Sequence, residues 1–199
     1  MDYFIADKVT VPEEMCRFFS EKLLYMPHCY QPNDRWRSEL PEPPSRATLG
    51  LPEEGFVFCS LNNPNKITPQ EFDVWMPLLQ AVENSVLWLL APDDHLKANL
   101  LKEADKRGIP ATRLVFAEKE TPANHLSRMQ QADLFLDAFN YNAHTTASEA
   151  VWAGVPLITK TGKQFSARVA TSILNAAGCP ELVTNTVEEY QSLALHLAT

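Results

Sequence analysis

Short apolar runs alternate with amphipathic segments along most of this chain. From residue 56 onward, apolar runs occupy residues 56–61, 85–90, 113–116, 134–136 and 157–159. Strands that are apolar on both sides are typical of a parallel sheet covered by helices on both faces. The pattern therefore predicts an α/β, Rossmann-like fold with three layers.

Each of these runs is followed by a segment with helical periodicity. The expected helices cover residues 69–81, 94–107, 122–132, 146–153, 166–177 and 187–197. Gly108, Gly154 and Gly178 stand where three of them should end, as expected for residues that close a helix. We find no internal repeat.

The first fifty residues follow a different pattern. Tyr3–Ala6 reads as a short strand, and a helix is expected from Pro12 to Leu24 because proline followed by two glutamates is a typical first turn. Residues 27–52 are rich in proline and predict an irregular connector. We therefore expect residues 1–50 to be a lead-in and residues 51–199 a Rossmann-like domain, together forming one compact unit.

Composition narrows the class of protein. The 199 residues are 45% hydrophobic and carry a formal net charge of −8, which argues against a nucleic-acid partner. Four scattered cysteines (Cys16, Cys29, Cys59 and Cys179) lack metal-ligand spacing and predict a reduced, cytoplasmic protein. The first residues lack the basic and long apolar regions of a signal peptide, so none is expected, and no apolar run approaches the ~20 residues of a membrane span.

The most informative segment is Asn140–Glu149, which joins an apolar run to a short apolar helix. Backbone N–H groups at a helix start are unpaired and carry partial positive charge, so His144, Thr145 and Thr146 could hold a phosphate or diphosphate there. The alternative is a plain N-cap, with Thr146 and Glu149 forming a capping box. Glu149 could instead accept bonds from ribose hydroxyls.

Two other loops should reach the same sheet edge. Lys66 follows the run 56–61 and could act as a phosphate ligand, although a loop lysine is more often a solvated charge. His125 and Arg128 share a face of the helix expected at 122–132, and the alternative for them is an ordinary surface helix. Neither a glycine-rich dinucleotide motif nor a Walker A motif nor a nucleophile elbow is present.

Taken together, these loops resemble the catalytic region of the O-linked N-acetylglucosamine transferases and their SPINDLY-like relatives. The resemblance runs nearly end to end and rests on the motifs Met1-Asp2-Tyr3, Ser20-Glu21-Lys22-Leu23, Tyr25-Met26-Pro27-His28, Gly50-Leu51-Pro52-Glu53, Lys66-Ile67, Asn84-Ser85-Val86-Leu87-Trp88-Leu89-Leu90, His144-Thr145-Thr146, Trp152-Ala153-Gly154, Ser166-Ala167-Arg168-Val169-Ala170 and Glu189-Tyr190.

This resemblance implies the carboxyl-terminal, donor-binding lobe of a GT-B glycosyltransferase. Such an enzyme transfers a sugar, here GlcNAc from UDP-GlcNAc, to Ser or Thr of proteins with inversion and without a metal or cofactor. It implies that Lys66 is catalytic by stabilising the leaving diphosphate. The implied donor-binding residues are Asn63, Lys66, Leu90, Lys119, Glu120, His125, Arg128, His144, Thr145, Thr146 and Glu149.

The sequence departs from the family pattern at three positions. Pro122 replaces a lysine of the human-type members, Glu149 replaces an aspartate, and Asn63 replaces a longer glutamine. These departures leave the base and the sugar open, including GDP-fucose as the donor of an O-fucosyltransferase. A non-catalytic nucleotide-sugar-binding or interaction module also stays open. A nucleotide-sugar epimerase is less favoured, because the further acids and bases that it needs are not evident.

The resemblance also places partners outside this chain. An amino-terminal lobe with a catalytic histidine and tetratricopeptide repeats that select acceptor proteins would lie upstream, so the chain alone is expected to bind donor weakly without turnover. No nucleic acid or membrane is expected as a partner. A homodimer formed through the lobe-facing surface is a further expectation.

Overall fold

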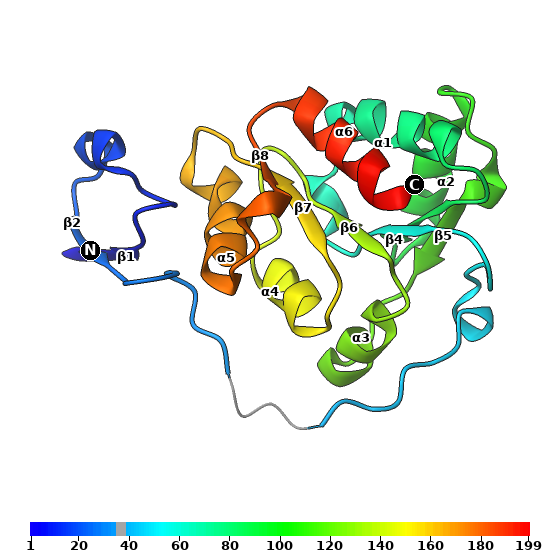
Figure 1. Ribbon diagram of the computed structural model, residues 1–199, viewed down its shortest axis with the longest axis horizontal. Coiled ribbons are helices and arrows are strands. Elements are labelled where there is room, and N and C mark those ends of the chain that lie inside the picture. The colour runs from blue at the N-terminus through cyan, green and yellow to red at the C-terminus, as the bar shows by residue number, and fades with distance from the viewer. Residues whose placement is uncertain (35–38) are drawn as a thin grey trace.

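The computed structural model describes residues 1–34 and 39–199 and shows a parallel sheet between two layers of helices (Figure 1). The strands of this sheet are β3 (Val57–Ser60), β4 (Val86–Leu90), β5 (Leu114–Ala117), β6 (Leu134–Leu136), β7 (Leu157–Lys160) and β8 (Val183–Thr184). The helices are α1 (Pro69–Ala81), α2 (Asp94–Asp105), α3 (Pro122–Met129), α4 (Thr145–Trp152), α5 (Val169–Ala177) and α6 (Val187–Ala198). The predicted α/β class is therefore confirmed.

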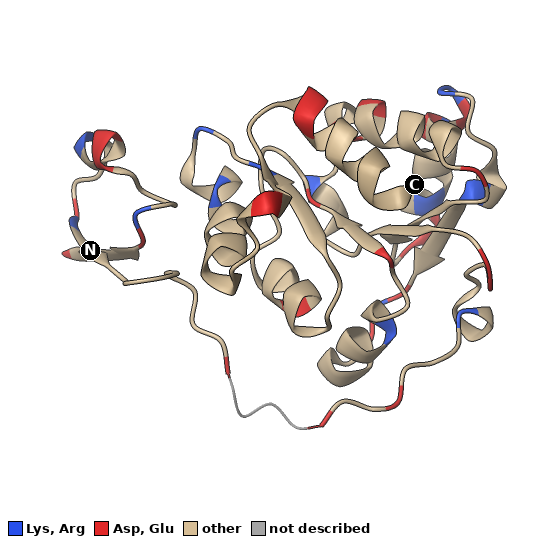
Figure 2. Cartoon of the chain, viewed as in Figure 1, with Lys and Arg blue, Asp and Glu red and all other residues tan. Residues whose placement is uncertain are grey.

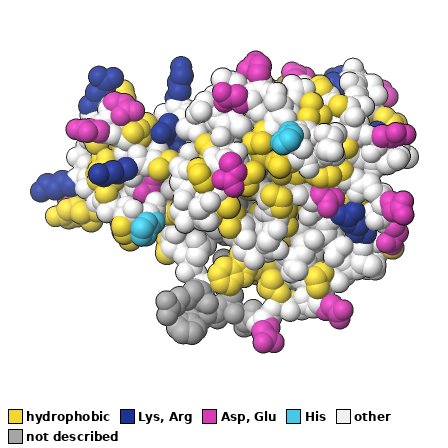
Figure 3. All heavy atoms as spheres, viewed as in Figure 1, with side chains coloured by type: hydrophobic (Ala, Val, Ile, Leu, Met, Phe, Trp, Pro, Cys, Tyr) yellow, Lys and Arg dark blue, Asp and Glu magenta, His cyan; other side chains and the backbone are white. Residues whose placement is uncertain are grey.

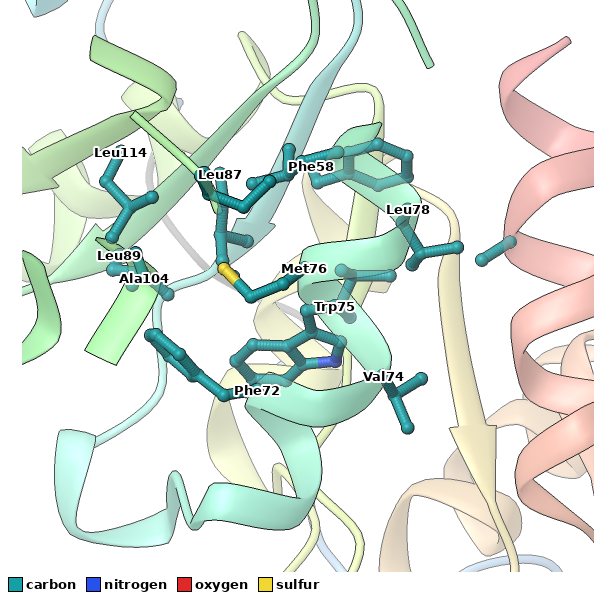
Figure 4. Close-up of a cluster of buried hydrophobic side chains, with 14 of the residues drawn as sticks. Phe58, Phe72, Val74, Trp75, Met76, Leu78, Leu87, Leu89, Ala104 and Leu114 are labelled. Atoms are coloured by element: carbon teal, nitrogen blue, oxygen red, sulfur yellow. The ribbon is translucent and has the colours of Figure 1, made fainter. Parts of the chain in front are cut away.

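The two faces of the sheet bury separate hydrophobic clusters. One face packs against α1, α2 and α6, and the other against α3, α4 and α5. On the first face, Trp75 and Met76 of α1 lie over Phe58, Leu87 and their neighbours (Figure 4). Burying each large side chain contributes roughly 1.5–3 kcal/mol, so a strand with both faces covered has to be apolar throughout.

The order of the strands fixes where a ligand can bind. The sheet runs β5-β4-β3-β6-β7-β8, and all its pairings are parallel. The chain therefore moves outward from β3 to β5, returns to the middle, and moves outward again from β6 to β8. Loops that leave β3 and β6 diverge to opposite faces, which opens a crevice at the carboxyl ends of these two strands.

Most helix positions agree with the sequence pattern, and the differences lie at the ends. Predicted helices 94–107 and 122–132 end earlier, at Asp105 and Met129, and the helix expected at 166–177 begins as a 3₁₀ turn (Phe165–Ala167) before α5. Strand β8 was not predicted, because two residues are too short to show a period. Thr68 and Thr186 cap α1 and α6 with complete capping boxes.

The prediction of a helix from Pro12 to Leu24 is wrong. A 3₁₀ helix covers Glu13–Phe18, and β2 (Lys22–Tyr25) pairs in parallel with β1 (Tyr3–Ala6) as a separate sheet. The Tyr25 hydroxyl donates to the carbonyl of Val11 at 3.0 Å. Pairing with β1 is a tertiary contact, and it overrides the helical start signal that the glutamates give locally.

Asp7 fastens this amino-terminal segment to the Rossmann-like domain. Its carboxylate is buried and accepts from the backbone of Val9, Thr10 and Tyr30 and from the hydroxyl of Ser172 in α5 at 2.7 Å. Large hydrophobic side chains of this segment remain exposed, namely Tyr3, Ile5, Phe18, Leu24, Tyr25 and Met26. Hydrophobic side chains are visible on the surface of this segment at the left of Figure 3.

The proline-rich connector is largely irregular, as predicted, but its described part includes a 3₁₀ turn at Ala47–Leu49. Residues 35–38 of the predicted connector lie outside the described residues. Beyond them, Nη2 of Arg46 donates to both carboxylate oxygens of Asp133 at 2.8–2.9 Å, an ion pair that ties the connector to the start of β6. In the described part of the chain, none of the helices has the length and apolar character to cross a membrane.

Candidate functional site

Two adjoining hollows lie at the carboxyl ends of the strands, around the point where the strand order reverses. The larger has a volume of about 640 Å³ and the smaller about 550 Å³, and both are lined by Asn63, Asn65 and Thr146. The larger hollow is also lined by Leu61, Pro64, Leu90, Pro92, Asp93, His95, Leu96, Asn99, Lys119, Glu120, His125 and Arg128. The smaller is completed by Lys66, Tyr141, His144 and Thr145.

Lys66 is held in the smaller hollow by the loop that follows β6. The 3₁₀ turn Pro64–Lys66 is fixed by Asn63, whose side chain accepts from the N–H of Asn65 at 3.1 Å. The ammonium of Lys66 donates to the carbonyl of Asn142 at 2.8 Å and lies 4.6 Å from the ring centre of Tyr141. Partial burial lowers the pKa of Lys66, and the negative charge of Asp137 acts in the opposite direction.

The start of α4 presents free backbone donors to the same hollow. Its N-cap is His144, with φ −104° and ψ −92°, and no side chain of the described residues caps the helix. The capping box predicted for Thr146 and Glu149 is therefore wrong. The N–H groups of Thr145 and Thr146 donate to no group in the described parts of the chain, residues 1–34 and 39–199. We call these two amides together with the Lys66 ammonium the anion seat.

His144 supports the anion seat without carrying charge to it. Its ring stacks on Tyr141, with centres 4.7 Å apart and planes 20° apart, and Nε2 donates to the carbonyl of Ser166 at 3.3 Å. Burial lowers the pKa of His144, the ammonium of Lys66 lowers it further, and the bond to Ser166 opposes both. The neutral form therefore prevails at pH 7, and the positive charge comes from Lys66 and the helix start.

His125 and Arg128 form one unit on the wall of the larger hollow. The guanidinium of Arg128 donates to the carbonyl of Glu118 at 2.7 Å and to Nδ1 of His125 at 3.1 Å, and it lies 5.9 Å from the ring centre of Trp88. Burial and the charge of Arg128 lower the pKa of His125 to about 4. A neutral His125 that accepts at Nδ1 carries its proton on Nε2, so it can donate there.

The structure brings together ten of the eleven residues that the sequence suggested. Glu149 lies on α4 but lines neither hollow. Other lining residues, Asn65 among them, were not predicted, and neither were two groups next to Lys66: Tyr141, which contacts both Lys66 and His144, and Asp137, which anchors the loop behind them. An aromatic residue inside the polar run 140–146 was the available signal for Tyr141, whereas Asp137 reads as an ordinary strand end.

Charges elsewhere on the molecule do not extend the anion seat. Lys and Arg are distributed over separate elements, and the described residues show no continuous basic strip (Figure 2). No group of three or more His, Cys, Asp or Glu side chains among the described residues could hold a metal ion. Independence from metal and cofactor stays a prediction.

The fold and the site together define an α/β, Rossmann-like protein with a crevice at its topological switch point, lined by the ammonium of Lys66 and the start of α4. The model of glycosyl transferase family 41 matches residues 38–199, and the chain belongs to this family. The structural neighbours of the chain include GT-B glycosyltransferases, which confirms the predicted fold.

Relatives match the chain over most or all of its length. A probable UDP-N-acetylglucosamine–peptide N-acetylglucosaminyltransferase, SEC of Arabidopsis thaliana, is 33% identical over the whole chain, and the corresponding enzyme of Caenorhabditis elegans is 39% identical over 78% of it. The chain covers 21% and 14% of these two proteins, respectively. The solved O-GlcNAc transferase mutant K341M of Thermobaculum terrenum matches with a TM-score of 0.86 and 29% identity, over 100% of this chain and 37% of that one.

Proposed function

We propose that the two hollows bind the nucleotide-sugar donor of a protein O-glycosyltransferase, with UDP-GlcNAc as the donor. The observation that carries this proposal is the convergence of the Lys66 ammonium and the two free amides of α4 at the switch point of the sheet. A diphosphate needs such a combination of one cation and backbone donors. The choice of UDP-GlcNAc rests on the relatives, which are named as UDP-N-acetylglucosamine–peptide N-acetylglucosaminyltransferases.

The geometry supports a division of labour between the hollows. The smaller hollow would take the diphosphate and the start of the sugar. The larger would take the nucleoside, with Leu90 and Leu61 offering apolar contact to the base and Lys119 and Glu120 at its edge. Nε2 of His125 would donate to an oxygen of the nucleotide. Glu149 lies outside the hollows, so we do not assign it to the ribose.

In the reaction, negative charge builds on the diphosphate as its bond to the sugar breaks. Donors that are already in place lower the barrier without reorganising, which is typically worth several kcal/mol. Lys66 and the amides of Thr145 and Thr146 have this role in our proposal. The acceptor hydroxyl would attack from the face of the sugar opposite to the diphosphate, which inverts the anomeric carbon and needs no metal.

The chain spans about a fifth of the length of SEC, the first of these relatives. We therefore propose that the acceptor protein and the group that deprotonates its hydroxyl are held by other parts of a longer enzyme. On this proposal the 199-residue chain binds donor weakly and does not turn it over. A cytoplasmic location and association with tetratricopeptide repeats belong to the same proposal.

Calorimetric titration of the chain with UDP, UDP-GlcNAc and GDP tests the donor site. We expect UDP and UDP-GlcNAc to bind with dissociation constants in roughly the micromolar to millimolar range, as for half of a two-lobed site. Tighter binding of GDP than of UDP would move the proposal to a GDP-sugar donor. If none of the three binds at millimolar concentration, the donor site is refuted.

Lys66→Met should weaken UDP binding by about tenfold or more, because a charge-assisted hydrogen bond is worth roughly 1.5–3 kcal/mol. Lys163→Met is the matched control, since Lys163 is an exposed lysine of the loop after β7 and does not line either hollow. Equal affinities of the two variants would show that Lys66 is not a diphosphate ligand.

A further inference from the structure

Asp137 is a fully buried carboxylate directly behind the anion seat. It follows β6, and its carboxylate accepts three hydrogen bonds: from the N–H of Ala138 at 2.9 Å, from the N–H of Ala143 at 2.6 Å, and from the hydroxyl of Thr159 at 2.6 Å. No ion pair with Asp137 is recorded among the described residues. An aliphatic side chain would cost less to bury, so the carboxylate needs an explanation.

The two oxygens of this carboxylate have different partners. Oδ1 accepts both backbone N–H groups, whereas Oδ2 accepts the Thr159 hydroxyl. A hydroxyl can turn from donor to acceptor, but a backbone N–H cannot. A proton on Oδ2 can therefore be accommodated by Thr159, while Oδ1 keeps both of its bonds.

The bonds to Oδ1 determine the shape of the anion seat. They close the loop between Ala138 and Ala143, which contains Asn142, the residue whose carbonyl holds the Lys66 ammonium. Ala143 immediately precedes His144, the N-cap of α4. Asp137 thus fixes Lys66 and the start of α4 through one oxygen atom.

Charged and titratable groups surround Asp137 on several elements. The ammonium of Lys66 attracts its negative charge from one side. Tyr190 of α6 donates to its main-chain carbonyl at 3.1 Å, and Glu71 of α1 accepts from the neighbouring N–H of Phe139 at 2.8 Å. His144 lies one residue beyond Ala143. Burial raises the pKa of Asp137 to about 7, although Lys66 and the three hydrogen bonds act in the opposite direction.

We propose that Asp137 is a positioning residue of the anion seat whose Oδ2 takes up a proton from solvent when a diphosphate binds there. The inference rests on the proposed donor site. An anion in the seat is attracted to Lys66 but repelled by an ionised Asp137, so occupancy and protonation favour each other. Donor affinity then falls as the pH rises through neutrality, by roughly three- to tenfold from about pH 6 to about pH 8.5, as expected for one nearby unit charge.

Calorimetric titration with UDP-GlcNAc, in buffers of different ionisation enthalpy, measures the protons taken up on binding. UDP-GlcNAc is the suitable probe because its diphosphate is esterified at both ends and does not titrate near neutral pH, unlike free UDP. We expect uptake of a fraction of a proton near pH 7. Binding without any uptake, at any pH across this range, would overturn the proposal while leaving the donor site intact; absence of binding would instead refute the donor site.

Two variants assign the proton. Asp137→Asn keeps a carbonyl oxygen for both N–H groups and should flatten the pH profile and lose most of the uptake; whatever remains belongs to His144 and Lys66, whose pKa values burial lowers. Thr159→Val removes the bond that lowers the pKa of Asp137, so maximal uptake should move to higher pH. A purely structural role would leave both profiles where they are. Uptake by Asp137→Asn equal to that of the unmodified chain, or an unmoved profile of a folded Thr159→Val, contradicts the proposal.

Discussion

Arg128 is a buried cation whose recorded partners are neutral groups. Only 5% of it is exposed, and its partners are a backbone carbonyl, a histidine nitrogen and the face of Trp88. Among the described residues no carboxylate forms an ion pair with Arg128, and only the charge of Glu120 acts on it from nearby, so an anionic ligand in the larger hollow could complete its partners. His125 has to stay neutral to accept from Arg128, which links the protonation of this histidine to folding.

Acid should therefore destabilise the chain at His125. The pKa is about 4 in the folded state and about 6.5 when unfolded, so the folded state binds fewer protons between these values. This contribution is fully present above about pH 6.5 and is lost as the pH falls towards 4. Urea denaturation of the chain and of His125→Gln should show a difference in pH dependence of roughly 1–3 kcal/mol over this interval.

Asp137 has the opposite sign, because its raised pKa makes the folded state bind more protons between about pH 4 and about pH 7. The contribution of Asp137 to the free energy of unfolding falls as the pH rises. The pH dependence measured for the unmodified chain is therefore the sum of the effects of Asp137 and His125. Comparison with His125→Gln isolates the histidine. If His125→Gln loses as much stability between about pH 6.5 and about pH 4 as the unmodified chain does, His125 does not cause the destabilisation by acid.

For single residues, the sequence predicted which side chains lie at the site better than it predicted their protonation states and contacts. Lys66 and His144 were found because polar residues after apolar runs belong to one sheet edge. The free amides of α4, the neutral state of His144 and the contacts of Tyr141 depend on which loops meet in space. A local pattern does not contain that information.

At the scale of secondary-structure elements, the loop between β7 and α5 contacts the residues that form the anion seat. The carbonyl of Ser166 accepts from the N–H of Asn142 at 2.8 Å and from His144, while Gly162 packs against Ala167. A Cβ atom built on Gly162 would lie 2.4 Å from the Cβ of Ala167, a separation that carbon atoms cannot adopt.

Gly162→Ala should therefore destabilise the chain by about 1–3 kcal/mol and should also weaken UDP binding, because the loop has to move. Gly154→Ala is the matched control: it is strained at φ +80°, but nothing lies within 4 Å of its new Cβ. Thermal unfolding and UDP titration of both variants test this expectation. Weakened binding in both, or in neither, would show that this loop does not support the site.

The predicted elements succeeded where a local signal and the tertiary environment agree. Apolar runs gave β3 to β7 because a strand buried on both faces must be apolar along its whole length. The segment 12–24 failed because a good helix start was followed by residues that pair with β1. The predicted ends of α2 and α3 were two or three residues too long, because the sequence signals at helix ends are weak.

In the molecule as a whole, we expect the hydrogen bonds of Asp7 to hold the amino-terminal segment against the Rossmann-like domain. Asp7→Ala removes acceptors from four groups, including Ser172 of α5, and should release residues 1–30 while the large sheet stays folded. Limited proteolysis should then cut this segment several-fold faster than in the unmodified chain. Asp2→Ala, a change at an exposed position, should leave the cleavage rate unchanged. Equal rates for the two variants would place the fastening elsewhere.

The central pairing of β3 with β6 has a consequence for the order of folding. β3, β4 and β5 can pair with their neighbours along the chain, but β6 returns to β3 across some 76 residues, the separation of Lys66 from Asn142. Contacts of such long range form late, after the entropy of closing the intervening chain has been overcome. The proposed nucleotide site should thus be the last feature to form in a refolding or newly synthesised chain, and UDP binding, once measured, can serve as a reporter of completed folding.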